Sequence, residues 1–335
     1  MAVRVGVIGT GVMGADHVRI LGSMVSRATV SAVTDLDLGR AREVARRVGA
    51  RVIDTPDALI EDADVDAVLV ASSDRTHEGF VLACLDADKP VLCEKPLTPT
   101  PEAALRIVGR EVDRGRRTVS VGFMRRYDPG FVAVKQALTD GAIAEPLMIH
   151  CVHRNASSRP NAPTAGLIHG SAVHEIDATR WLLGEEIARV TVHRGRRSSR
   201  VVGETADPLL CVFETESGVV VDVEVFVNAQ YGYEVRCEVV GETGTVMVDE
   251  PPQAVLRSAQ RRTTSVAYDW RDRFAEAYRR ELQDWIDGIV AGDPQRGASA
   301  WDGYAATAVA AAGVEALATG AIVEVKLESR PALYG

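Results

Sequence analysis

A lysine that follows a short apolar run is the residue of this chain best suited to chemistry on an oxygen atom. Lys95 stands in the tripeptide Glu94-Lys95-Pro96, directly after the apolar residues 90–93. Such a run is typical of a buried strand, and open α/β sheets bind ligands beyond the carboxyl ends of their strands. Lys95 is therefore a candidate to hydrogen-bond an oxygen that is an alcohol in one direction and a carbonyl in the other. A lysine that simply reaches solvent is the alternative.

A histidine in the second half of the chain could take the proton of that alcohol. His174 and Asp177 are three residues apart, so they share a face of the helix expected over residues 171–183. Near the start of that helix, the dipole would help to keep the imidazole neutral and able to accept a proton. A capping or core role is the alternative for His174, while Glu175 and Arg180 are expected to point elsewhere.

The chain begins with a glycine-rich turn that suits a dinucleotide. A G-x-G-x-x-G pattern follows an apolar strand pattern at residues 3–8 and opens a helical one. In that context the glycines permit a tight turn, close approach of a pyrophosphate and packing of the helix on the sheet. The free N–H groups of the helix start favour phosphate. A glycine-rich turn without nucleotide is the alternative. We expect NAD to be bound by Gly9, Thr10, Gly11, Val12, Met13 and Gly14.

A carboxylate after the second expected strand indicates which dinucleotide binds. Asp35 lies about 20 residues past the glycines, where it can accept hydrogen bonds from both ribose hydroxyls. Its charge would repel a 2′-phosphate, so NAD is favoured over NADP. Arg40 is a further candidate, although on a helix it would also be solvated or paired. The expected cofactor-binding residues further include Ser72, Ser73, His77, Glu94 and Lys95.

Polar side chains on later segments could address a polyhydroxylated ligand. His153 and Asn155 share a face of an expected strand, whereas His150 faces the opposite side, so the two histidines cannot hold one metal ion from there. Tyr231 and Tyr233 also share a face, and either a contact to substrate or core packing would explain them. No ligand spacing is convincing for a metal, and we expect none.

The elements that must position these residues begin with an alternating pattern. Over residues 1–122, continuous apolar runs alternate with helical segments, which predicts a parallel sheet covered on both faces. We expect strands at 3–8, 29–34, 66–71, 90–93 and 118–121, and helices at 12–24, 38–48, 76–86 and 101–114.

The pattern changes after residue 122. Successive strand patterns with short turns predict a mostly antiparallel sheet, and two helices close the chain. We therefore expect an α/β Rossmann domain over residues 1–122, followed by an α+β domain over residues 123–335 with a large, mostly antiparallel open sheet. Its expected strands are 147–153, 187–193, 209–214, 219–228, 233–240 and 245–248, and its helices 129–138, 171–183, 271–290 and 305–321.

Composition narrows the class of protein. A chain of 335 residues with 46% hydrophobic and 25% charged residues is globular and too long for one ordinary core. The net charge of −9 argues against non-specific nucleic-acid binding. Five cysteines without a Cys-x-x-Cys pair support neither a disulfide framework nor a thiolate zinc site. With no signal-peptide or spanning pattern, we expect a cytoplasmic protein that does not bind membranes.

Several motifs together resemble the Gfo/Idh/MocA oxidoreductase family. The Glu-Lys-Pro tripeptide at 94–96 marks that family, and Arg125-Arg126 and His153-Arg154-Asn155 are more particular to its inositol dehydrogenases. The likeness runs nearly from end to end of the chain. The motifs that carry it lie at residues 9–14, 93–97, 122–128, 150–155, 174–177, 231–234 and 300–304.

The resemblance implies NAD-dependent oxidation of a secondary ring alcohol of a cyclitol, such as myo- or scyllo-inositol. It implies Lys95 at the reacting oxygen, His174 as the base, and a homodimer or homotetramer formed through the C-terminal sheet. Tyr278 would reach the substrate across a subunit contact. The residues implied to contact this small polyol are Arg125, His153, Asn155, Asp177, Tyr233 and Tyr278.

One position departs from the resemblance. Inositol dehydrogenases usually carry an aspartate four residues before the catalytic histidine, and this chain has Gly170 there. Loss of an orienting carboxylate can cost several orders of magnitude in rate. Four outcomes are open. Asp177 or Ser171 could replace the missing carboxylate, or His169 could take a role. Otherwise the substrate would differ, or the enzyme would be slow. A sugar or aminosugar dehydrogenase of a biosynthetic pathway and a non-catalytic NAD-responsive binding protein remain alternatives.

Overall fold

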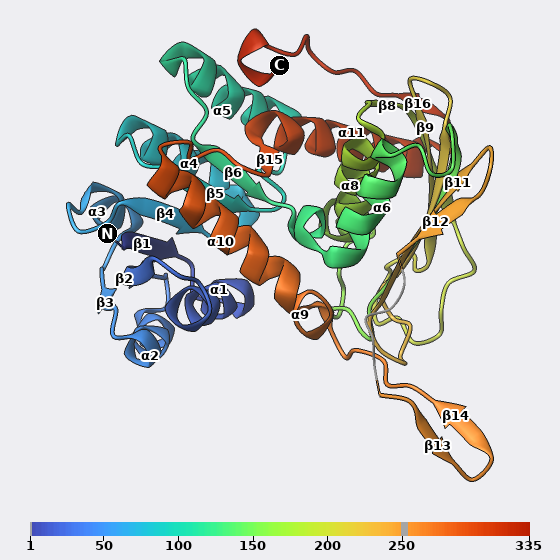
Figure 1. Cartoon of the computed structure of the whole chain (residues 1–335), viewed down its shortest axis with the longest axis horizontal. Helices are drawn as coiled ribbons and strands as arrows, with labels where there is room; N and C mark the ends of the chain where they lie inside the picture. The colour runs from blue at the N-terminus through green and yellow to red at the C-terminus, as the bar shows by residue number, and fades with distance from the viewer. Residues whose placement is uncertain (1, 249–253) are drawn as a thin grey trace. The chain divides into compact units, whose positions relative to one another are not determined.

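The computed structural model divides the chain into two compact units (Figure 1). It describes residues 2–248 and 254–335. The first unit comprises Met1–Met124, Glu276–Ala308 and Leu327–Gly335, and the second comprises Arg125–Ala275 and Val309–Lys326. These units differ from a linear division at residue 122, because two later segments return to complete the first unit.

The first unit is built on a sheet in the strand order β15-β6-β5-β4-β1-β2-β3. All neighbouring strands run parallel except β15, which pairs antiparallel with β6. Every residue of β4 and β5 is buried, as expected for strands covered on both faces. The bounds are β1 Val3–Ile8, β2 Ala28–Thr34, β3 Arg51–Val52, β4 Ala67–Val70, β5 Val91–Glu94, β6 Val119–Gly122 and β15 Ala298–Ser299.

Helices cover both faces of this sheet. Helix α1 contacts α2, while α3, α4 and α5 contact one another in sequence, and Figure 1 shows the sheet between these two groups. The bounds are α1 Val12–Ser23, α2 Leu38–Val48, α3 Pro56–Glu61, α4 His77–Asp86, α5 Pro101–Arg114 and α10 Ala275–Ala291, with short turns η1 Asp74–Thr76 and η4 Ala332–Tyr334. Helix α11, Ala300–Thr319, begins in the first unit and ends in the second.

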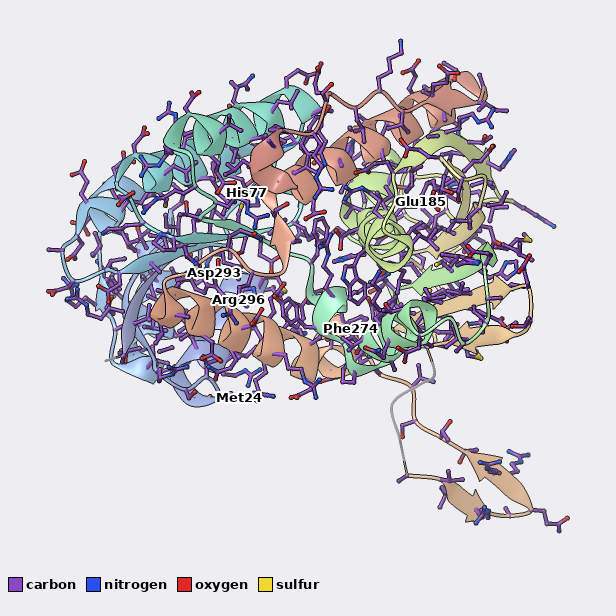
Figure 2. All side chains as sticks on the ribbon, turned by 45° about the horizontal axis from the view of Figure 1, so that its top comes forward. Met24, His77, Glu185, Phe274, Asp293 and Arg296 are labelled. Atoms are coloured by element: carbon purple, nitrogen blue, oxygen red, sulfur yellow. The ribbon has the colours of Figure 1, made fainter. Side chains whose placement is uncertain are left out.

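Helix α10 belongs to the first unit, and its side chains bond to the segment that follows α1. Gln283 accepts a hydrogen bond from the Ser26 amide at 2.8 Å, and Asp287 pairs with Arg27 at 2.5 Å. At its other face, a Cβ at Gly288 would lie 2.5 Å from the carbonyl oxygen of Asp293. Figure 2 shows Asp293 beside α10, in the loop that leads to β15.

The second unit contains a sheet in the order β12-β11-β7-β10-β9-β8-β16. Among these described strands only the β7–β10 pair is parallel, so the mostly antiparallel sheet is confirmed. The strand bounds are β7 Pro146–Arg154, β8 Ile187–Arg194, β9 Leu209–Thr215, β10 Val220–Phe226, β11 Glu234–Gly241, β12 Thr245–Met247 and β16 Val323–Glu324.

In the described residues, most side chains on one face of this second sheet are buried, and those on the other face, called the open face below, are partly or fully exposed. Along β7, Ile149, Cys151 and His153 are buried, whereas Met148 and His150 are exposed. Helix α8 contacts β7 on the covered face. The remaining elements are η2 Met124–Tyr127, α6 Pro129–Thr139, α7 Ala165–Leu167, a π-helix Ile168–Ala172, α8 Val173–Leu183, a hairpin of β13 Leu256–Ser258 and β14 Arg261–Thr263, and α9 Trp270–Arg273.

All five cysteines are buried free thiols. Among the described helices, none combines the length and the hydropathy needed to cross a membrane.

Candidate active site

The glycine-rich turn has the geometry that a dinucleotide requires. Gly9 has φ +93°, and a Cβ there would lie 2.6 Å from the Ala71 carbonyl oxygen. A Cβ at Gly14 would lie 1.9 Å from the Gly9 carbonyl oxygen, so the close packing of α1 on the turn demands glycine. At Gly11 no heavy atom of the described residues lies within 4 Å of such a Cβ. The start of α1 carries no acidic side chain, so the turn fits a pyrophosphate.

Asp35 follows β2 and lies against this turn. Its Oδ2 accepts hydrogen bonds from the Thr10 amide at 2.6 Å and hydroxyl at 2.9 Å, and its Oδ1 accepts one from Arg40 at 2.6 Å. Burial raises the pKa of Asp35, but hydrogen bonds from Arg40, Asp37 and Thr10 outweigh burial and lower the pKa to about 2. A carboxylate therefore stands beside the glycines, where the ribose contact is predicted, and Arg40 is paired with it.

The segment after β4 is tied to the turn that follows Lys95. His77 is buried at the start of α4, and its Nδ1 lies 2.8 Å from the Pro96 carbonyl oxygen. Its Nε2 lies 3.3 Å from the Ser72 carbonyl oxygen, and the Ser72 hydroxyl pairs with Thr76 at 2.7 Å. The cofactor contacts predicted for Ser72, Ser73 and His77 remain predictions.

Lys95 directly follows the carboxyl end of β5, the position expected for a ligand-binding lysine. Its amide donates to Glu94 Oε2 at 3.1 Å, and Glu94 Oε1 lies 2.7 Å from His17 Nε2. Burial raises the pKa of Glu94, but the hydrogen bond and charge of His17 and the charge of Lys95 outweigh it and lower that pKa. The peptide bond from Lys95 to Pro96 is cis.

His174 lies in a longer helical segment than the sequence suggests. The backbone is helical from Ala165 through the π-helix at residues 168–172 into α8, so His174 is not at the start of a helix. The expected help from a helix dipole is therefore wrong, because that effect falls off within the first turn. The π-helix contains Gly170, and within residues 2–248 and 254–335 no heavy atom lies closer than 4 Å to a Cβ built there. π-helices are frequent at functional sites.

A buried charged network surrounds His153. Arg125 and Glu175 form an ion pair with side chains 2% and 1% exposed. His153 Nδ1 lies 3.1 Å from Glu175 Oε1 and 3.1 Å from Arg125. Burial raises the pKa of Glu175, but the charges of Arg125 and His153 outweigh it and lower the pKa. Burial also raises the pKa of Tyr233 to about 12, and Tyr233 packs edge-on against His153.

The sequence did not single out Glu175 as part of this network. It lies between His174 and Asp177 in the same motif, but only the strand that carries His153 reveals its partners. Arg180, also expected to be structural, forms an ion pair with Glu186.

The network lies next to the predicted base. The rings of His153 and His174 are stacked with centroids 6.1 Å apart. Asp177 accepts two hydrogen bonds from Arg126, at 3.0 and 2.6 Å. The Oδ1 atom of Asn155 is buried, and no donor in the described part of the chain reaches it. Buried donors and acceptors thus gather around His174.

Other predicted positions lie elsewhere. His150 pairs with Asp222 on the open face of the sheet, opposite to His153, as the strand alternation predicts. Tyr231 is half exposed and donates to Glu234. Tyr278, in the first unit, packs edge-on against His17 with centroids 5.7 Å apart. In the described parts of the chain, no group of three side chains could hold a metal ion.

Comparison with known proteins identifies the family. Residues 3–123 match the oxidoreductase family's NAD-binding Rossmann fold, and residues 135–327 match its C-terminal alpha/beta domain. Inositol 2-dehydrogenase 1 of Saccharopolyspora erythraea is 55% identical, with 100% of both chains covered. Inositol 2-dehydrogenase of Pseudomonas savastanoi is 47% identical, again over 100% of each. The crystal structure of Lactobacillus casei myo-inositol dehydrogenase with NAD(H) and myo-inositol is 39% identical, covers 100% of each chain and has a TM-score of 0.96. This chain therefore belongs to the Gfo/Idh/MocA oxidoreductase family.

Proposed function

We propose that this protein oxidises a secondary ring alcohol of a cyclitol, myo- or scyllo-inositol, to the ketone with NAD⁺. The observation that carries the proposal is the full-length likeness to a myo-inositol dehydrogenase solved with NAD(H) and myo-inositol, at 39% identity and a TM-score of 0.96. Lys95 at the end of β5 and His174 within its buried polar surroundings support the same reaction.

The cofactor would be held by the glycine-rich turn and by Asp35. The open space at Gly11 and the start of α1 suit the pyrophosphate, and the Asp35 carboxylate suits the ribose hydroxyls. The proposed contacts from Arg40, Ser72, Ser73, His77 and Glu94 complete the set. When bound, NAD⁺ supplies the acceptor for the hydride of the ring carbon.

The chain's own residues would handle the proton and the oxygen. The Lys95 ammonium donates a hydrogen bond to the hydroxyl oxygen and stabilises negative charge that develops on it. An imidazole nitrogen of His174 accepts the hydroxyl proton, which is the role of a general base. Because both groups are fixed before reaction, positioning and electrostatics supply most of the rate.

The remaining ring hydroxyls would meet the polar cluster around His174. The Oδ1 of Asn155 is buried and has no hydrogen-bond partner among the described residues. It supports this role, since a buried acceptor is stabilised by a donor such as a hydroxyl. The mixed donors and acceptors of the cluster suit a ligand that carries a hydroxyl on every carbon. The proposed substrate contacts are Arg125, His153, Asn155, Asp177, Tyr233 and Tyr278.

A second candidate function follows from Gly170. The open space at this position would admit a substituent that an aspartate would exclude. A sugar or aminosugar dehydrogenase of a biosynthetic pathway would use that space. This alternative keeps Lys95 and His174 in the same roles and differs only in the substrate.

We also propose that the protein is a cytoplasmic homodimer or homotetramer that pairs through the open face of the second sheet. Five buried free thiols suit a reducing compartment. On the open face, Met148, Leu210 and Met247 are 38%, 40% and 51% exposed. Exposed apolar side chains on one sheet face favour burial against a second copy. Light scattering on the purified protein would give the number of subunits.

A substrate panel tests the proposed function. Purified protein with NAD⁺ is offered myo-inositol, scyllo-inositol, glucose and an aminocyclitol, and NADH formation is followed by absorbance. We expect the highest kcat/KM with one of the inositols. Preference for glucose or the aminocyclitol would support the second candidate. Tight NAD⁺ binding without turnover of any polyol would instead support a non-catalytic NAD-responsive protein.

A further inference from the structure

We propose that two buried histidines of the first unit, His17 and His77, are positioning residues for Lys95. His17 acts through the carboxylate of Glu94, and His77 acts through the carbonyl group of Pro96. The proposal rests on the proposed function, because it assigns these contacts a role in holding the lysine at the reacting oxygen. Neither histidine belongs to the predicted catalytic pair.

The contact from His17 reaches Lys95 through both oxygens of one carboxylate. His17 is 0% exposed in α1, and its Nε2 lies 2.7 Å from Glu94 Oε1. Glu94 Oε2 accepts the hydrogen bond of the Lys95 amide at 3.1 Å. Since a carboxylate only accepts, the proton of this imidazole is assigned to Nε2. In the described residues, the buried Nδ1 of His17 has no hydrogen-bond partner.

The surrounding elements leave Glu94 little freedom. A Cβ at Gly122 on β6 would lie 3.3 Å from Glu94 Oε2, which is a tight contact. On the other side, the Tyr278 ring of α10 packs edge-on against His17. A shift of Glu94 would therefore require movement of β6, α1 or α10, so the Lys95 backbone is fixed to three elements.

The contact from His77 uses the other ring nitrogen. His77 is 1% exposed at the start of α4, and its Nδ1 lies 2.8 Å from the Pro96 carbonyl oxygen. A carbonyl oxygen only accepts, and carbonyl oxygens lie near both ring nitrogens, with that of Ser72 at 3.3 Å from Nε2. The shorter contact assigns the proton to Nδ1. Figure 2 labels His77 on this helix. The residues before and after Lys95 are thus held by histidines from two different helices.

Glu94 also brings a charge to the lysine. Its pKa lies below the ordinary value although burial opposes this, since His17 and Lys95 favour the ionised form. The titratable groups that face Glu94 are His17 from α1 and its two sequence neighbours, Cys93 on β5 and Lys95 directly after it. Tyr278 of α10 lies behind His17. Because the charges of Glu94 and Lys95 attract each other, the carboxylate favours the charged form of the lysine, which donates a hydrogen bond.

Amide replacements distinguish these contacts by their geometry. A glutamine nitrogen can take the place of Nε2, and an asparagine nitrogen the place of Nδ1. His17→Gln and His77→Asn should keep kcat for the best inositol within about threefold of wild type, whereas His17→Asn and His77→Gln should lower it by about 100-fold. Each pair is a matched control for packing. The Kd for NAD⁺, measured by fluorescence, should stay within about twofold of wild type in both His17 variants. Because His77 is also a proposed cofactor contact, its two variants are compared with each other, and their Kd values should differ by less than about twofold.

Two kinetic outcomes would overturn the proposal. Equal losses for both amides at one position would mean that packing, and not the hydrogen bond, matters there. A loss at His17 that appears as a raised Kd for NAD⁺ with kcat unchanged would make His17 a cofactor contact instead. The same result at His77 would leave His77 a cofactor contact only, without a role in holding Lys95. Thermal unfolding of each variant identifies a loss that arises from misfolding.

A spectroscopic measurement tests the charge without relying on turnover. The chain has only four lysines, so ¹³C-methylated Lys95 can be resolved by NMR in the intact protein. In Glu94→Gln, the Lys95 resonance should titrate about one pH unit lower than in wild type. An unchanged midpoint would overturn the proposal. If wild type oxidised no polyol, the proposed function would fail, while this titration would still report on Glu94 and Lys95.

Discussion

The surroundings of Lys95 and of His174 differ in how each side chain is held. Lys95 is held through backbone groups, because its own amide and the next carbonyl are bound by Glu94 and His77. His174 lies beside a network of charged side chains in which Arg125 and Glu175 are buried together. Hydrogen bonds to backbone groups depend little on side-chain charge. A buried network of charges, in contrast, is strongly destabilised when one member is neutralised. The two regions should therefore respond differently to similar substitutions.

The largest expected effect is the loss of either reacting group. Lys95→Ala and His174→Ala should each lower kcat by about 1000-fold, because one removes the donor to the oxygen and the other removes the base. NADH formation with the best substrate measures this, and the Kd for NAD⁺ should be nearly unchanged in both variants. A loss below tenfold in either variant would remove that residue from the proposed chemistry.

The next largest effect is on stability, and it is compared by replacing one buried glutamate with glutamine in each region. Glu175→Gln should lower the free energy of unfolding by about 3 kcal/mol, because Arg125 is then left as a buried charge without its partner. Glu94→Gln should cost about 1 kcal/mol, because an amide oxygen can still accept from His17 or from the Lys95 amide. Urea unfolding of both variants checks the order. A larger loss for Glu94→Gln would reverse the comparison.

Acid should reduce the difference in unfolding free energy between wild type and Glu175→Gln. Its pKa is lower in the folded protein than the ordinary value of 4.5, so its contribution is fully present above that value and is lost as the pH falls through the folded pKa. The gap in unfolding free energy between wild type and Glu175→Gln should therefore be constant from about pH 7 to pH 5 and shrink below about pH 4.5. A gap that grows on acidification would show that the carboxylate destabilises the fold.

The smallest expected effect is a gain in kcat when the missing carboxylate is restored at Gly170, near His174. The open space there can hold an aspartate side chain, which would orient the His174 imidazole from one turn away. Gly170→Asp should raise kcat for an inositol by about tenfold, a modest part of what such a carboxylate supplies in triads. Gly170→Asn serves as the uncharged control. If both variants lose activity, the space is needed by the substrate, which would favour the second candidate function.

The first unit is the more predictable from sequence because its elements follow local patterns. The helix at residues 38–48 has its predicted bounds, with Asp37 as the capping residue at one end and Gly49 in the left-handed region at the other. The strands β3 and β15 were not predicted, since two residues are too few to show a period. The turn at Gly9–Gly14 and the position of Lys95 after a strand could also be predicted, because each depends on one short continuous motif.

The surroundings of His174 depend on contacts between distant segments, which no local pattern reveals. The helical backbone that leads into α8 begins at Ala165, ahead of the predicted start at residue 171, because the Ala-Gly-rich sequence there resembles a loop. The parallel pairing of β7 with β10 was not predicted, as successive strands suggested antiparallel neighbours. Glu175 and His17 were missed for the same reason, since their partners lie 22 and 77 residues away.

The return of the chain to β15 bears on any attempt to separate the two halves of this protein. β15 pairs with β6, and α10 bonds to the segment after α1. A fragment that stops at residue 124 would therefore expose the edge of β6. It would also expose the surface that the buried side chains of α10, Tyr278, Leu282 and Trp285, cover in the intact unit. Grafting the nucleotide half onto another enzyme thus requires three separate stretches of chain, and recombination within this family is expected to preserve all three together.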